Sequence, residues 1–159
     1  MLAFRGWRAV DGRLRSPYVP VYWDARVAEA HCNRPALWEP GSGTGVLTAH
    51  GAPAPGCSCG IYAFEHPSHD LATVDYRGVT GAVSLWGNVE VHPNGMRAQH
   101  ASVEALAIYS RWTARQKSVV FRIADELDVE LVDLYDLDAY AERFTERLER
   151  EPRELLPVS

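Results

Sequence analysis

The stretch Ala82-Val-Ser-Leu-Trp-Gly-Asn-Val-Glu-Val91 decides the fold, because apolar and more polar residues alternate along it. An extended strand places these two sets on opposite faces: Val83, Leu85, Val89 and Val91 on one, and Ser84, Trp86, Asn88 and Glu90 on the other. Gly87 in mid-strand indicates a bulge or a close approach of another backbone. The turn His92-Pro-Asn-Gly95 follows, and residues 96–105 run back. The sequence therefore predicts a long antiparallel hairpin.

Shorter strands are expected before this hairpin. Residues 4–10 and 13–18 flank Asp11-Gly12, a dipeptide that favours a two-residue hairpin turn because it tolerates positive φ at both positions. Residues 25–32 are interpreted as a strand or a short helix. Residues 33–56 are rich in proline and glycine and are expected to be mostly loop. Residues 60–64 follow as a short buried strand.

The chain after Ser110 changes in character. Residues 113–127 show the apolar spacing typical of a helix, and residues 129–134 are expected to form a short strand. Asp136 is expected to cap a last helix. The apolar stripe of that helix is Leu137, Tyr140, Phe144 and Leu148. We therefore predict an α+β fold. A twisted or barrel-like antiparallel sheet forms a β-rich domain over residues 1–110, and a helix–strand–helix extension over residues 111–159 packs on the same core.

The composition limits the class of protein. The chain has 159 residues, of which 47% are hydrophobic, enough for one core without disulfides. We find neither a signal peptide nor an apolar run long enough to span a membrane, so we expect a cytoplasmic protein with no membrane partner. The net charge of −5 combines a basic segment, residues 1–26, with an acidic one, residues 125–159. The acidic end argues against nucleic-acid binding there.

The segment His50-Gly-Ala-Pro-Ala-Pro-Gly-Cys-Ser-Cys59 carries the strongest chemical signal. Together with Cys32, the remaining cysteine, it offers three thiols and one imidazole, the ligands that structural zinc prefers. In a reducing cytoplasm these thiols are available to a metal. On a flat strand, Cys57 and Cys59 point to the same face but their sulfurs lie too far apart to bind one ion, so we predict a kink there. Four protein ligands leave no open coordination position, which favours a structural zinc.

Other interpretations of this segment stay open. His31, His66 or His69 could replace His50 as the fourth ligand. An iron–sulfur cluster uses the same ligand types as zinc. The three cysteines could also be reduced core residues, or Cys32 could form a disulfide with Cys57 or Cys59.

The same residues carry a resemblance. Ala54-Pro-Gly-Cys-Ser-Cys-Gly-Ile-Tyr-Ala63 and the Trp86-Gly87 strand resemble a group of small uncharacterised proteins from actinobacteria and their phages. The likeness extends over residues 4–135 and includes Gly6-Trp7-Arg8 and His50-Gly-Ala-Pro53. It implies that Cys32, His50, Cys57 and Cys59 belong together as one set. It implies no activity.

Three classes of function follow from these features. The one we favour is a zinc-stabilised, non-enzymatic binding module with a regulatory or accessory role, contacting protein or nucleic acid. Its expected binding face combines aromatic and cationic residues: Arg5, Trp7, Arg8, Trp86 and Arg97. The first alternative is a small enzyme with an acid–base pair among Glu90, His92 and His100. The second is a structural or oligomerising protein without metal. We find no sequence motif of a known catalytic site.

Overall fold

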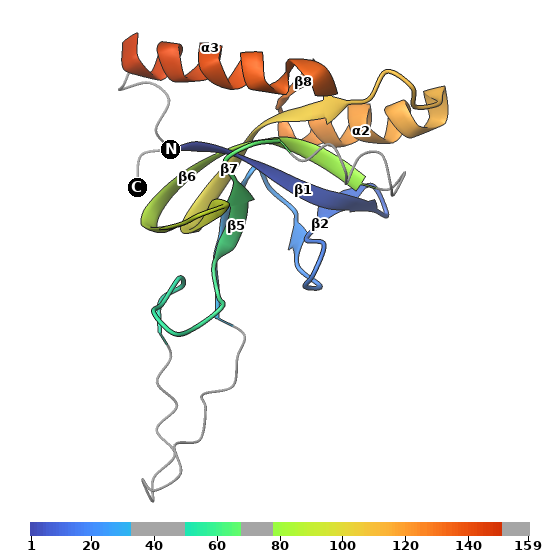
Figure 1. Ribbon diagram of the computed structural model, residues 1–159. Helices are drawn as coiled ribbons and strands as arrows, with labels where there is room; N and C mark the ends of the chain where they lie inside the picture. The colour runs from blue at the N-terminus through green and yellow to red at the C-terminus, as the bar shows by residue number, and fades with distance from the viewer. Residues whose placement is uncertain (33–49, 68–77, 151–159) are drawn as a thin grey trace, which may run out of the picture.

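A computed structural model describes residues 1–32, 50–67 and 78–150 of the chain, and the side chains of residues 148–150 lie outside that description. Its elements run in the order β1 (Leu2–Val10), β2 (Arg13–Arg15), β3 (Tyr22–Trp23), β4 (Val27–Glu29), β5 (Ile61–Phe64), β6 (Gly78–His92), β7 (Gly95–Ile108), α2 (Ala114–Leu127), β8 (Glu130–Asp133), a 3₁₀ turn (Leu134–Asp136) and α3 (Leu137–Arg150). The α+β class with a twisted, mainly antiparallel sheet is confirmed. Figure 1 shows α2 and α3 on one side of the sheet, with β5 and the loop before it extending away from them.

The predicted long hairpin is present as β6–β7, and it lies at the centre of the sheet. His92 pairs with Gly95 across the turn, and Glu90 pairs with Arg97. At Gly87 the register shifts and φ is 79°, so the predicted bulge is confirmed. The bulge interrupts the alternation, and Val91 near the turn is 67% exposed.

The β7 strand organises the rest of the sheet. β6 pairs along one of its edges, while the other edge pairs in turn with β5, β4 and β8. β8 is parallel to β7, and the β5 and β4 pairings are antiparallel. On the far side of β6 lies β1, which continues into β2 through the Asp11-Gly12 turn. Both turn residues have positive φ, at 51° and 75°, as this type of hairpin requires.

One hydrophobic core joins the sheet to the helices. Trp7 of β1 is 1% exposed and packs edge-to-face on Trp23, with ring centroids 5.4 Å apart. Both helices add buried side chains to the same core: Val120, Ile123 and Ala124 from α2, and Leu137, Tyr140 and Phe144 from α3. None of the helices in the described part of the chain has the length and apolarity needed to cross a membrane.

The helix boundaries follow local capping. Thr113 caps α2 with a reciprocal capping box to Gln116, so the predicted helix begins one residue later, at Ala114. The expectation for Asp136 was wrong. Asp133 instead accepts a hydrogen bond from the backbone N–H of Tyr135, and the chain passes through the 3₁₀ turn before α3 begins.

Candidate metal centre

The β7 strand brings Cys32 and Cys59 together from distant parts of the sequence. β5 pairs with residues 95–98 of β7, ending at the Ile61–Ala98 pair, so Cys59 lies just before this pairing. β4 pairs with the next stretch of β7, and the Ala30 N–H donates to the Gln99 carbonyl at 2.7 Å. The segments that carry the two cysteines therefore meet β7 at neighbouring positions.

A tight turn sets the position of Cys57. The Cys57 N–H donates to the Ala54 carbonyl at 3.1 Å, and Gly56 has φ of 76°. Proline followed by glycine at positive φ is typical of a type II turn. Gly60, with φ of 126°, bends the chain again just before β5. The kink predicted around Cys57 and Cys59 is confirmed.

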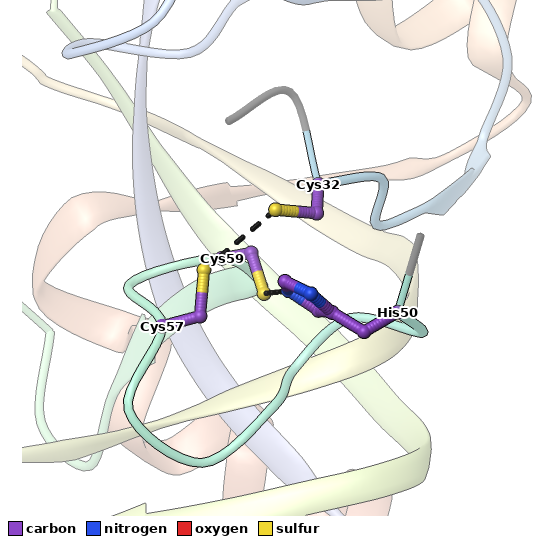
Figure 2. A group of neighbouring side chains, drawn as sticks. All are labelled: Cys32, His50, Cys57 and Cys59. Atoms are coloured by element: carbon purple, nitrogen blue, oxygen red, sulfur yellow. Dashed lines mark hydrogen bonds between the residues drawn. The ribbon is translucent and has the colours of Figure 1, made fainter. Parts of the chain in front are cut away.

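These two bends bring four side chains together (Figure 2). One metal-binding atom from each of Cys32, His50, Cys57 and Cys59 lies within 4.8 Å of all the others. The Sγ atoms of Cys32 and Cys57 are 3.6 Å apart, and the Sγ of Cys59 lies 3.4 Å from Nε2 of His50. The grouping expected from the sequence is thus present, and three cysteines with one histidine can bind a metal such as zinc.

Two of the separations between these atoms are close to those around a single tetrahedral ion. Zn–S bonds of about 2.3 Å and Zn–N bonds of about 2.0 Å place neighbouring ligand atoms about 3.5–3.8 Å apart in a tetrahedron. The two measured separations come close to these values. The cysteines are free thiols, and 3.6 Å is well beyond the disulfide bond length of about 2.05 Å. The alternative of a Cys32–Cys57 or Cys32–Cys59 disulfide is therefore wrong for this structure.

The two neighbouring thiols have different proton affinities. A hydrogen bond from the backbone of Cys59 lowers the pKa of Cys57 to about 6, which favours the thiolate form of this side chain. Desolvation raises the pKa of Cys59, and its hydrogen bond with Cys57 adds to that effect. Metals bind the thiolate form, which Cys57 offers more readily than Cys59.

Polar side chains of the hairpin hold the loop of residues 50–60 against the sheet. The Arg97 guanidinium donates to the carbonyls of Ala54, Cys57 and Cys59, and it also pairs with Glu90. The Nδ2 of Asn88 donates to the Pro53 carbonyl at 2.9 Å. The hydroxyl of Tyr62, on β5, donates to the Ser58 carbonyl at 2.8 Å.

The remaining candidate ligands stand apart from this site. His31 and His66 are exposed and do not belong to the cluster. His69 lies outside the described residues. Within the described part of the chain, His50 is the histidine that the fold brings to the three thiols.

The predicted aromatic and cationic binding face does not form. Arg5, Trp7 and Arg97 are 9%, 1% and 6% exposed, whereas Arg8 is exposed and Trp86 half-buried. The reason is that Arg5 and Trp7 pack into the core beside Trp23, where burial lowers the pKa of Arg5 to about 10. Arg97 is covered by the loop of residues 50–60.

Of the expected catalytic group, Glu90 and His92 come together and His100 does not join them. His92 lies 3.9 Å from Glu90, but the Glu90 carboxylate is held by Arg97. His100 pairs with Trp86 across the strands and stacks on its ring, because the Gly87 bulge moves the register. A cavity of about 530 Å³ between β1, β6 and α2 is lined by other residues, among them Val79, Trp112 and Arg115. Neither Glu90, His92 nor His100 lines this cavity.

Sequence reasoning missed the structural role of Arg97 and Glu90. A two-residue turn at Pro93-Asn94 places these two residues directly opposite each other on the hairpin. The register of the predicted hairpin was therefore sufficient to predict the ion pair. No sequence pattern indicates that the loop covers Arg97.

Comparison with known proteins adds no relative to this picture. No family model, curated protein or solved structure matches the chain. The resemblance to small actinobacterial and phage proteins stays a prediction, and the case for the site rests on its geometry.

Proposed function

We propose that Cys32, His50, Cys57 and Cys59 bind one structural zinc ion that fastens the loop of residues 50–60 to the sheet. The observation that carries this proposal is the convergence of the four ligand atoms within 4.8 Å. With all four positions of a tetrahedral ion taken by protein, no site is left for a substrate or an activated water. The zinc then serves stability, because a metal bound to the folded state alone adds to folding free energy.

The ligand spacing favours a single ion over an iron–sulfur cluster. A cluster of several irons sits between its ligands and spreads them across its own width. Four ligand atoms all within 4.8 Å of each other suit the shell of one ion. Three thiolates and one imidazole are soft or borderline ligands, which favours zinc over magnesium or calcium.

The module that this zinc stabilises acts, in our proposal, in a regulatory or accessory role through contact with protein or nucleic acid. Support comes from Tyr62 and Phe64 of β5, which are 45% and 41% exposed. Aromatic residues are common at such contacts. A photo-crosslinking residue at position 62 is expected to capture one defined partner in cells, and the same residue at Tyr18, which is 89% exposed, is the control. Equal crosslinking from both positions would contradict this part of the proposal.

Elemental analysis of protein purified without added metal tests whether the site binds zinc. We expect about one zinc per chain, as in other four-ligand structural sites. Cys57→Ser and Cys59→Ser each remove a ligand and should lose the metal and lower the melting temperature. His66→Ala changes a histidine outside the cluster and should do neither, and we expect the same of His69→Ala. The same zinc content in the wild type and both cysteine variants would refute the proposal.

A further inference from the structure

Arg97 is an unusually connected residue for one that offers no metal-binding atom. Its side chain is 6% exposed on β7, beneath the loop that carries two of the cysteines. Nε donates to Glu90 at 2.8 Å. One terminal nitrogen donates to the Cys57 carbonyl and, at 3.2 Å, to the Cys59 carbonyl, while the other donates to Glu90 and to the Ala54 carbonyl. One guanidinium thus satisfies three backbone carbonyls and one carboxylate.

The three carbonyls belong to the segment that sets the ligand positions. Ala54 and Cys57 are the ends of the Pro55-Gly56 turn, and Cys59 follows two residues later. Because Arg97 binds both ends of this turn as well as Cys59, it fixes the backbone of two ligands relative to β7. The planar fork of arginine donates in several fixed directions at once, which the single ammonium of lysine does not reproduce.

Glu90 fixes the orientation of that fork. It lies directly opposite Arg97 in the β6–β7 pairing, and one carboxylate oxygen accepts from both Nε and a terminal nitrogen. This pairing keeps the other donors of the guanidinium directed at the loop.

We propose that Arg97, oriented by Glu90, is the positioning residue of the metal centre, holding Cys57 and Cys59 in ligand geometry. This inference rests on the proposed zinc site. Residues that orient metal ligands without touching the metal are known to change metal affinity by about 10–100-fold. Arg97 acts through the ligand backbone, so its loss lowers affinity by increasing the freedom of the loop that the metal must order.

The test measures zinc affinity by competition with a chromophoric chelator. Arg97→Lys keeps the charge and loses the fork, and we expect about 10–100-fold weaker binding. Glu90→Gln removes the negative charge that orients the Arg97 guanidinium, and it should weaken zinc binding less. Arg26→Lys is the matched control, because Arg26 also pairs with a glutamate, Glu104, but its other contacts are to the carbonyls of Val103 and Asp128. The control should bind zinc as the wild type does.

Cobalt substitution separates positioning from general stability. Tetrahedral cobalt absorbs in the visible range, so a change in ligand geometry alters the spectrum of a variant that is still folded. We expect an altered spectrum for Arg97→Lys and an unchanged one for Arg26→Lys. If Arg97→Lys is unfolded, Glu90→Gln gives the same test with a milder change.

The outcomes distinguish the two proposals. A wild-type protein that binds no zinc would end the proposed function, and the role of Arg97 with it. A wild type that binds zinc, with folded Arg97→Lys and Glu90→Gln that bind it equally well and give the same cobalt spectrum, would overturn the role of Arg97 alone.

Discussion

In the β6–β7 hairpin, Val83, Val103 and Leu106 are completely shielded from solvent, whereas in the neighbouring loop of residues 50–60 the buried residues are Ala52 and Pro53. The hairpin obtains its stability from apolar burial, at about 25 cal/mol per Å². The loop buries too little apolar surface to order itself in this way. It depends on hydrogen bonds donated by the hairpin and on the cluster of thiols and imidazole. The hairpin and the adjoining loop are thus stabilised by different kinds of interaction.

The largest expected effect comes from a core substitution in the hairpin, and its size should not depend on the metal. Leu106→Ala leaves a cavity at a site that is 0% exposed and should cost about 2–5 kcal/mol of unfolding free energy. Urea denaturation measures this loss, and it should be the same with zinc and with a chelator. A loss that vanished without zinc would show that the hairpin depends on the metal and would break the comparison.

Metal removal is expected to act mainly on the loop. A ligand at 100 times its dissociation constant stabilises the folded state by about 2.7 kcal/mol, which the chelator would remove. Hydrogen exchange should then accelerate in residues 50–60, while the amides of β6 and β7 keep their protection. Addition of zinc after chelation should restore the protection. Uniform loss of protection over the whole sheet would contradict a division between the two regions.

The smallest effect concerns the hydrogen bond between Asn88 and the Pro53 carbonyl. Asn88→Ala removes one donor and should cost about 0.5–1.5 kcal/mol, seen as faster exchange around residues 52–54. Asn88→Asp has nearly the same size but no amide donor and should behave alike. If Asn88→Asp exchanged as slowly as the wild type, the hydrogen bond would not be what holds this part of the loop.

Most of the fold could be predicted because its signals are local. Asp11-Gly12 and Gly87 indicate positive φ, which few other residues adopt. Thr113 indicates the start of a helix because its hydroxyl can cap the first turn. The strand at residues 82–91 follows from alternation alone. The parallel pairing of β7 with β8 depends on contacts between distant segments, which no local pattern encodes.

The site was predictable in its ligands but not in its support. Cysteine and histidine have few other reasons to gather in a proline- and glycine-rich segment, so their identities indicate the cluster. Arginine and glutamate are common on surfaces, and only the loop that covers Arg97 makes its burial favourable.

The pairing of β8 with β7 has a consequence for contact between separate chains. Ala105 and Leu106 of β7 pair with β6 on one side, and residues 105–108 pair with β8 on the other. Without β8, Ala105, Leu106 and Ala107 would present a row of open backbone donors and acceptors next to apolar side chains, which invites strand addition and aggregation. The short strand β8, between α2 and α3, therefore prevents a strand of another molecule from pairing with this edge of β7.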